Sequence, residues 1–277
     1  MLRLIESSIA AIERQLVLVA PGQASCVDGF ANVTNDAARK RELIHEMQRL
    51  RGSIYLEEGN VTHHELTADG RHQTVEDDRS WHLLMTDDHG RVRSCVLYLE
   101  HDNVVSMGDL RLRECPLITS PASRGSVTAA VESEIGRARH AGLRFGELGG
   151  WAITKERRCT PDGLMMTLAV YALCRMRGGA LCITTANVAH SCSSILRRLG
   201  GAYLEFDGVP IPSYFDPRYN TAIDLLRFDS RTPSPKYAEL IQMVMSKLAN
   251  VWVVGGSLET AVDPLSVTGA AQSGCAA

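Results

Sequence analysis

The sequence FGELGGWAITKERRCTPDGLMMTLAVYALCRMRGGALCITTANVAHSCSSILRRL, residues 145–199, decides the fold. Its pattern predicts a strand, a basic loop, a helix, a second strand and a short helix, in that order. The start of the long helix is well marked, because Thr160 is a good N-cap and Pro161 suits the first helical position. Gly178 and Gly179 mark its end. We expect 145–154 and 180–185 to be neighbouring parallel strands joined by this helix.

The loop before that helix is basic, with Lys155, Arg157 and Arg158. Free backbone N–H groups and the helix dipole both favour an anion at a helix N-terminus. The loop is therefore a candidate site for a phosphate or for an acidic carrier protein. A solvated charged surface is the alternative interpretation.

Composition limits the class of protein. The chain has 277 residues, 45% of them hydrophobic, and a net charge of −3, which argues against a dedicated nucleic-acid binder. No stretch approaches about 18 apolar residues, so we expect no transmembrane segment. Charged residues interrupt the apolar run at the N-terminus, which does not resemble a signal peptide. The eight cysteines contain no C-x-x-C pair and are expected to be reduced thiols of a cytoplasmic protein.

The remaining elements give a mixed α+β order rather than a regular βαβ alternation. Helices are expected at 2–16, 35–51, 126–141 and 235–249, and strands at 81–85, 92–99, 202–206 and 221–228. We predict an N-terminal helix in 1–30, one main domain over 31–250 and a flexible tail over 251–277. The amphipathic N-terminal helix would pack on the main domain or form a homodimer contact.

Three segments carry a family resemblance. Glu147-Leu148-Gly149-Gly150-Trp151 resembles the E-x-S-R-F segment of acyl-homoserine lactone synthases and N-acyl amino acid synthases. Residues 195–201 (ILRRLGG) resemble a helix and turn common in GNAT proteins, and 214–219 (YFDPRY) resembles a segment of N-acyl amino acid synthase relatives. The resemblance covers roughly residues 35–250. It implies a GNAT-like acyl-CoA N-acyltransferase fold, in which a central mixed sheet is flanked by helices and contains a splayed parallel strand pair.

The resemblance implies an N-acyltransferase that moves a fatty acyl group from an acyl thioester to a small amine, such as an amino acid. The donor would be acyl-CoA or acyl carrier protein, and no tightly bound cofactor is expected. An acyl-homoserine lactone synthase-like enzyme is one alternative, although Gly150 stands where those enzymes carry an arginine. A non-catalytic acyl-thioester-binding module is the other, because Leu196 replaces the usual tyrosine acid and the pyrophosphate loop is not intact.

Glu147 is the candidate catalytic residue. Attack of an amine on a thioester needs a base, and apolar neighbours along a regular strand would disfavour the charged form of this carboxylate. Phe145, Gly149, Trp151 and Ile153 would share its face. A structural ion pair with an arginine is the alternative. The Gly149-Gly150 pair predicts a bulge whose free N–H groups could meet the thioester carbonyl, or else simple relief of crowding.

The family pattern also implies a set of donor-binding residues on the first strand, the basic loop, the helix start and the second strand. They are Trp151, Ala152, Ile153, Thr154, Arg157, Arg158, Gly163, Leu164 and Asn187. Asn187 could instead cap a turn. Tyr214 or Tyr219 could supply the proton that Leu196 cannot.

Histidine and cysteine patterns are less informative. His190 and Cys192 are two apart on a helix and would point to different sides, so we do not expect a nucleophile pair. His63, His64 and His72 lack the spacing of a known metal site, and no metal is expected.

Overall fold

A computed structural model describes residues 2–22, 29–102, 104–188 and 192–256, and every structural statement below concerns these residues. The helices are α1 (Leu2–Gln15), α2 (Ala37–Glu57), α3 (Pro116–Thr119), α4 (Pro121–His140), α5 (Asp162–Met176), α6 (Cys192–Arg198) and α7 (Pro235–Leu248). Short 3₁₀ turns are η1 (His63–Glu65), η2 (Met107–Asp109), η3 (Arg111–Glu114) and η4 (Lys155–Arg157). None of these helices is long and apolar enough to cross a bilayer.

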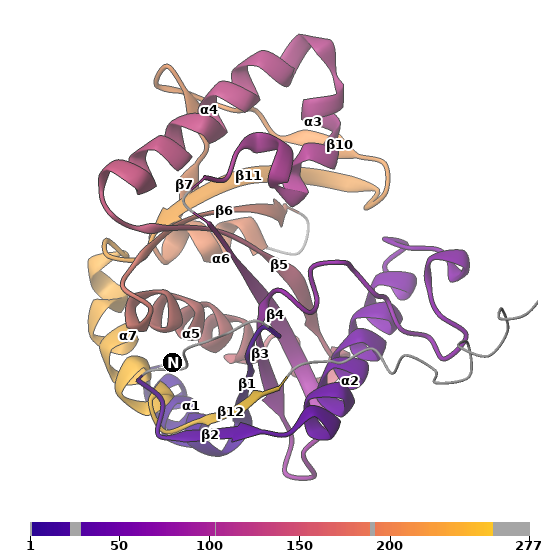
Figure 1. Ribbon diagram of the computed structural model, residues 1–277, viewed down its shortest axis with the longest axis vertical. Coiled ribbons are helices and arrows are strands. Elements are labelled where there is room, and N and C mark those ends of the chain that lie inside the picture. Colours follow the sequence, from indigo (N-terminus) through magenta and orange to yellow (C-terminus); the bar gives the residue numbers. More distant parts are fainter. Residues whose placement is uncertain (1, 23–28, 103, 189–191, 257–277) are drawn as a thin grey trace, which may run out of the picture.

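One mixed sheet runs through the molecule in the order β10-β11-β6-β5-β4-β3-β1-β12-β2 (Figure 1). Its strands are β1 (Leu16–Val19), β2 (Asn32–Asn35), β3 (Trp81–Thr86), β4 (Val92–His101), β5 (Arg144–Ile153), β6 (Ala180–Asn187), β10 (Tyr214–Asp216), β11 (Thr221–Asp229) and β12 (Trp252–Gly255). The short β7 (Ala202–Tyr203) pairs with β11, and β8 (Glu205–Phe206) and β9 (Val209–Pro210) form a separate hairpin. The α+β class predicted from the sequence is confirmed.

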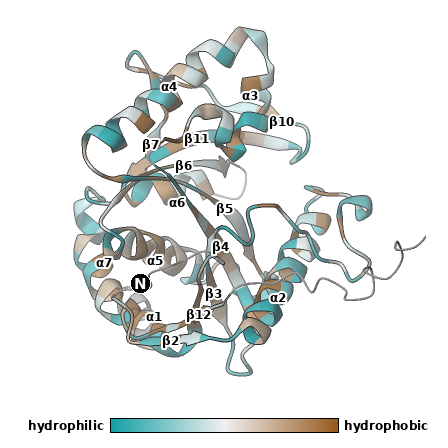
Figure 2. Ribbon diagram, viewed as in Figure 1, coloured by the Kyte–Doolittle hydropathy of each residue, from teal (hydrophilic) through white to brown (hydrophobic). Residues whose placement is uncertain are grey.

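Helices cover both faces of this sheet. Helices α1, α5 and α7 lie on one face, where α5 is predominantly apolar (Figures 1 and 2). Helices α2 and α4 cover different parts of the other face. Alternate strand residues point to opposite layers, as strand geometry requires: on β6, Cys182 joins the α5 layer and Ile183 the α4 layer. The sheet is therefore buried on both sides over most of its width.

Strands β5 and β6 are parallel neighbours, as the sequence predicted. Their ladder runs from Arg144–Ala180 to Leu148–Thr184 and then ends. Beyond that point β5 pairs with β4 as far as Ile153, and β6 pairs with β11 as far as Asn187. The two strands therefore part, and α5 is the crossover that connects them (Figure 1).

Five strands were missed by the sequence analysis: β1, β2, β9, β10 and β12. Strand β1 lies between β3 and β12, so the segment 1–30 contributes a strand to the main sheet as well as a helix. Residues 252–255 form β12, so the tail predicted over 251–277 is wrong at its start; residues 257–277 lie outside the described part of the chain. These strands are only two to four residues long. Partners far away in the sequence determine β1, β2 and β12, whereas β9 and β10 pair with the strands next to them in the sequence.

A buried charge network joins α2 to the loop before β3. Arg51 donates two hydrogen bonds to Asp77, at 2.9 and 2.7 Å, and Gln48 donates a third at 2.9 Å. Burial opposes ionisation of Asp77, but the hydrogen bonds and charge of Arg51 prevail and lower its pKa to about 2. His82 lies beside this network, with Nε2 2.6 Å from the carbonyl oxygen of Asp77. Burial lowers the pKa of His82 to about 4, although the charge of Asp77 opposes this shift.

The lowered pKa of His82 predicts acid sensitivity. The unfolded chain takes up this proton near pH 6.5, and the folded chain only near pH 4, so stability contributed by neutral His82 is lost as pH falls between these values. We expect a loss of about 3 kcal/mol in unfolding free energy from this residue. Denaturant titrations from pH 7 to pH 4 should show a shallower pH slope for His82→Gln than for the wild type. Equal slopes would contradict the prediction.

Candidate active site

The two glycines of β5 form the predicted bulge. Cys95 pairs with Ala152 and Leu97 with Gly149, so two residues of β5 oppose one of β4. Gly150 has a φ of +63°, and a Cβ there would lie 2.9 Å from Leu97 Cδ2. Glycine meets both constraints because it has no side chain and tolerates positive φ.

The bulge changes which side chains share a face. Trp151 packs on the α5 side, against the cluster that contains Leu196 and Leu226. Phe145 belongs to the α4 layer, and Ala152 to the α2 layer. The expectation that Trp151 shares the face of Glu147 was therefore wrong, because the extra residue inverts the strand's alternation.

Glu147 is buried at 4% exposure and accepts hydrogen bonds that organise a turn. Its Oε2 accepts from the backbone N–H of Arg111 at 2.9 Å, and its Oε1 from that of Leu112 at 3.1 Å. The Nε2 of His101 lies 2.9 Å from the same Oε2. The carboxylate thus holds the start of η3 against β5. The sequence analysis offered an ion pair with an arginine side chain as the alternative role of Glu147. The observed partners are instead two backbone N–H groups and the side chain of His101.

Arg111 is the residue that this turn positions, and the sequence analysis missed it. Its guanidinium covers Gly149 so closely that a Cβ there would lie 2.2 Å from Nη1. Glu76 is the carboxylate beside it, with Oε2 3.9 Å from Nε. The side chain of Arg111 is 30% exposed, so a partly accessible cation lies over the bulge, on the face opposite Trp151. The small residue at 149 was the only sequence signal for this close approach.

The basic loop is neutralised by carboxylates of the same chain. Lys155 pairs with Glu57 and Arg158 with Glu58, both at the C-terminal end of α2, the latter at 2.7 Å. Arg157 donates from Nε to Asp162 at 2.8 Å. Any anionic ligand of this loop must compete with these three carboxylates.

Helix α5 begins one residue later than predicted. Pro161 occupies the cap position, and the hydroxyl oxygen of Thr160 accepts from the N–H of Asp162 at 3.3 Å. The first turn lies beside the end of β5, because a Cβ on Gly163 would lie 3.6 Å from Ile153 Cδ1.

The other predicted donor residues divide between two sides of the sheet. Trp151 and Leu164 pack in or against the α5 layer, whereas Ala152 faces α2. The backbone N–H of Thr154 donates to Arg93, and Asn187 ends β6, where its side chain accepts from Thr221 at 3.4 Å. The structure therefore brings Trp151, Ile153, Gly163 and Leu164 to the parting of the strands and leaves Ala152 on the opposite face.

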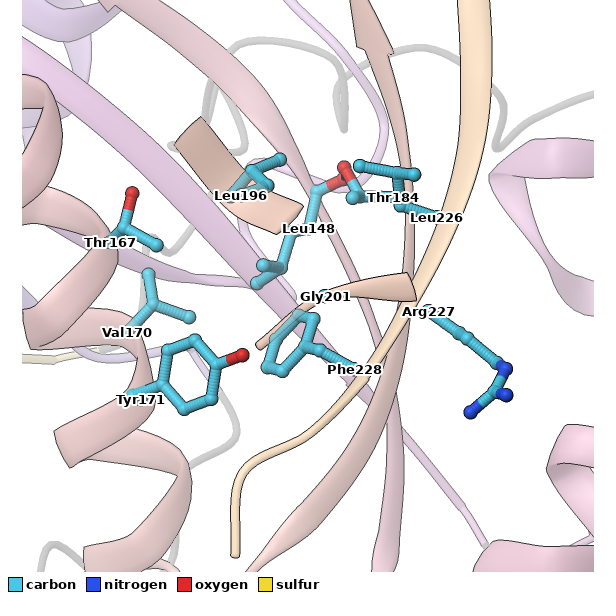
Figure 3. Close-up of a pocket in the computed structure, with 10 residues that line it drawn as sticks. All are labelled: Leu148, Thr167, Val170, Tyr171, Thr184, Leu196, Gly201, Leu226, Arg227 and Phe228. Atoms are coloured by element: carbon cyan, nitrogen blue, oxygen red, sulfur yellow. Dashed lines mark hydrogen bonds between the residues drawn. The ribbon is translucent and has the colours of Figure 1, made fainter. Parts of the chain in front are cut away.

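A small cavity lies at the parting, on the α5 side (Figure 3). Leu148 and Thr184, the last pair of the β5–β6 ladder, form part of its wall. The other lining residues come from α5, α6, β11 and the turn before β7: Thr167, Val170, Tyr171, Leu196, Gly201, Leu226, Arg227 and Phe228. Its volume is about 10 Å³, which is room for about one water molecule.

The two tyrosines predicted as possible proton donors lie near the α4 layer. Tyr214 is 8% exposed and Tyr219 is partly buried against the same cluster. Their role in proton transfer stays a prediction. His190 lies outside the described residues, so its relation to Cys192 is not described. Across the described chain, no three His, Cys, Asp or Glu side chains converge as metal ligands.

Comparison with solved structures identifies the fold. The CoA-dependent acyl-homoserine lactone synthase BjaI, solved with SAM and isopentyl-CoA, superposes with a TM-score of 0.55 at 13% identity, covering 88% of this chain and 93% of that chain. The CoA-dependent lactone synthase MesI gives a TM-score of 0.50 at 12% identity, covering 84% and 95%. The fold is GNAT-like. No family model matches the sequence, and no curated protein matches it.

The contacts of Glu147 predict a stability cost for its amide. In Glu147→Gln an NH₂ group replaces one oxygen and faces a backbone N–H, which loses its acceptor. We expect the unfolding free energy to fall by about 1–3 kcal/mol. Glu76→Gln is the control, because among the described residues its carboxylate makes only the 3.9 Å ion pair, so the change should alter stability by less than about 1 kcal/mol. Equal melting temperatures for wild type and Glu147→Gln would show that the backbone contacts matter little.

Proposed function

We propose that this chain is an N-acyltransferase that moves an acyl group from a thioester donor to a small amine that carries a carboxylate, such as an amino acid. One observation carries the proposal: two parallel strands part after Leu148 and Thr184, and a glycine bulge lies at that point on β5. The parting gives a thioester arm a path between the strands, and the bulge presents backbone N–H groups outside the β4 ladder. These groups would stabilise the oxyanion that forms on the thioester carbonyl.

The donor thioester lies on the α5 side of the bulge in this proposal. Trp151 supports this placement, because its Nε1 is buried and has no hydrogen-bond partner within the described chain. An indole N–H in that state can donate to a carbonyl of the donor. The loop 155–158 would contact the phosphates of coenzyme A or the acidic surface of a carrier protein.

The acceptor amine approaches from the opposite face, over Gly149. Arg111 and Glu76 lie side by side there, with opposite charges 3.9 Å apart. A zwitterionic amino acid matches this pair, since its carboxylate would pair with the guanidinium and its ammonium with Glu76. A base first takes one proton from the ammonium, and the neutral amine nitrogen then attacks the thioester carbon. As the C–S bond breaks, the nitrogen loses a second proton, which the leaving thiolate takes up, so that an amide and a thiol result.

Two carboxylates are candidates for the base. Glu147 is the residue that the sequence favours, and Glu76, whose side chain is 15% exposed, lies beside Arg111. A general base contributes about 10²–10⁴-fold to the rate and sets the acidic limb of the pH–rate profile. If Glu147 is the base, we expect Glu147→Gln to lower kcat by this 10²–10⁴-fold factor and to abolish the acidic limb of the pH–rate profile; if Glu76 is the base, we expect the same of Glu76→Gln. If neither change has this effect, the amine arrives already neutral.

The direct test is product analysis. The protein is incubated with acyl-CoA, acyl carrier protein and mixed amino acids, and products are identified by mass spectrometry. N-acyl amino acids are the expected result. S-adenosylmethionine is included as an acceptor because the BjaI structure holds SAM. An acyl-homoserine lactone among the products would favour an acyl-homoserine lactone synthase-like enzyme instead. The alternative is a non-catalytic acyl-thioester-binding module, which predicts that the donor binds but no product forms. The small cavity favours this alternative, because its volume of about 10 Å³ leaves no room for an acyl chain.

Acceptor recognition can be tested with Arg111 and Gly149. Removing a charge-assisted contact in Arg111→Ala should raise the acceptor KM by about 10–100-fold and leave the donor KM unchanged. Gly149→Ala should have the same effect, because its Cβ would displace the guanidinium, and should add little to Arg111→Ala. Melting curves control for folding. Additive effects of the two changes would mean that Gly149 acts independently of Arg111.

Donor recognition can be tested with the loop and its intramolecular partners. Charge reversal of Arg157 and Arg158 should raise the donor KM. Glu57→Gln with Glu58→Gln should lower it by up to about fivefold, because Lys155 and Arg158 lose their competing carboxylates. Both effects should shrink as salt rises. An unchanged donor KM in both double variants would exclude this loop from the donor site.

A further inference from the structure

The bulge on β5 has a side-chain partner on β4. The thiol of Cys95, which is 1% exposed, donates to the carbonyl oxygen of Gly150, with Sγ 3.3 Å from that oxygen. The backbone N–H of Ala152 donates to the same sulfur. The thiol therefore bridges the residues on either side of Trp151, where two residues of β5 oppose one of β4 and the regular ladder is interrupted.

This thiol stays protonated at neutral pH, so it remains a hydrogen-bond donor. Burial raises the pKa of Cys95 to about 12, although the charge of Arg51 and the N–H of Ala152 oppose the rise. Arg51 also lies close to the bulge, since a Cβ on Gly150 would lie 3.4 Å from its Nη1. That Nη1 already donates to Asp77 at 2.9 Å. Cys95 is therefore the side chain that the structure shows bonded to this carbonyl group.

The contact fixes the direction of the next backbone N–H. A trans peptide group is planar and the described chain contains no cis peptide bond, so the carbonyl of Gly150 and the N–H of Trp151 point in opposite directions. Cys95 belongs to the α2 layer, so its thiol holds the carbonyl toward that face of the sheet. The N–H of Trp151 is thereby turned toward the α5 face, where the indole of Trp151 also packs.

We propose that Cys95 is a positioning residue: its thiol holds the carbonyl of Gly150 toward α2 and so directs the N–H of Trp151 at the carbonyl oxygen of the donor thioester. The inference rests on the proposed acyl transfer, which places that thioester on the α5 side of the bulge. The N–H of Trp151 stabilises the negative charge that forms on the oxygen, whereas the thiol touches neither donor nor acceptor. Because such a fixed donor acts on the transition state more than on the bound substrate, loss of the thiol lowers kcat and leaves both KM values unchanged.

Kinetics of three variants test the role of the thiol. Cys95→Val removes the donor and should lower kcat by about 10- to 100-fold, less than the roughly 10²–10³-fold cost of losing an oxyanion donor itself. Cys95→Ser keeps a hydroxyl donor and should retain most of kcat. Cys174→Val is the matched control: its thiol is also fully buried, near the C-terminal end of α5, so stability should fall but kcat should not. A valine variant at Cys95 as fast as the wild type, or a serine variant as slow as the valine variant, would overturn the inference.

Nuclear magnetic resonance reports on the contact without any turnover. The bond between Gly150 and Trp151 is the chain's only Gly-Trp peptide bond, so ¹³C in glycine carbonyls and ¹⁵N in tryptophan leave a single carbonyl-to-nitrogen correlation. Cys95→Val should shift its ¹³C resonance, because the carbonyl oxygen loses a hydrogen bond, and Cys174→Val should not. An unchanged ¹³C resonance in Cys95→Val would overturn the inference.

The same signal separates this inference from the proposed function. The probe is the ketone analogue of acetyl-CoA, in which CH₂ replaces the sulfur and the carbonyl remains, so it binds without reacting. Its binding should shift the N–H resonance of Trp151 in the wild type and in Cys174→Val, and much less in Cys95→Val. This result supports the inference even if no product forms with any acceptor. An equal shift in Cys95→Val and the wild type, or no shift in either, would overturn it.

Discussion

The end of the ladder between β5 and β6 is the constraint on which the candidate site depends. Each strand keeps its outer partner beyond that point, since β4 follows β5 to Ile153 and β11 follows β6 to Asn187. The two strands cannot follow diverging partners and remain paired with each other. The bulge adds a residue to β5 at the same level, which bends the strand and increases its twist. The cavity, the placement of Trp151 and the approach of α5 to Ile153 all follow from this divergence.

The opposite face is organised by buried charges that are paired. Glu147 binds backbone N–H groups of η3, and this turn carries Arg111 to a position over Gly149. Asp77 binds Arg51 and Gln48 nearby, and ties α2 to the chain before β3. Removal of one partner from such a pair leaves an uncompensated buried charge, which is costly. The charged groups Glu147 and Asp77 on this face are thus held by fixed partners.

The electrostatics of the loop 155–158 differ from those of a free basic patch. The cations of the loop form ion pairs with Glu57, Glu58 and Asp162. An anion can therefore bind to them only if it displaces these carboxylates. The pair of Lys155 with Glu57 is exposed and therefore weak, so its exchange costs little. Asp162 is buried, so displacing it from Arg157 costs more. The pairs with Glu57 and Glu58 fix the loop to the end of α2. An anion that broke these pairs would therefore also loosen a contact with α2, the helix that carries Arg51.

The sequence by itself determined the order of the main elements, the parallel strand pair and its helix, and the bulge. These features depend on local signals: an apolar helix, a capped start and two glycines within a strand. The sequence analysis wrongly placed Trp151 and Glu147 on one face of β5. The bulge changes the alternation of side chains along the strand, and only the pairing with β4 fixes where the extra residue lies.

Only the tertiary structure decided the membership of β1 and β12 in the sheet, the contacts of Glu147 with residues 111 and 112, and the pairing of Arg158 with Glu58 across 100 residues. In each case the partner is set by chain segments that meet only after folding.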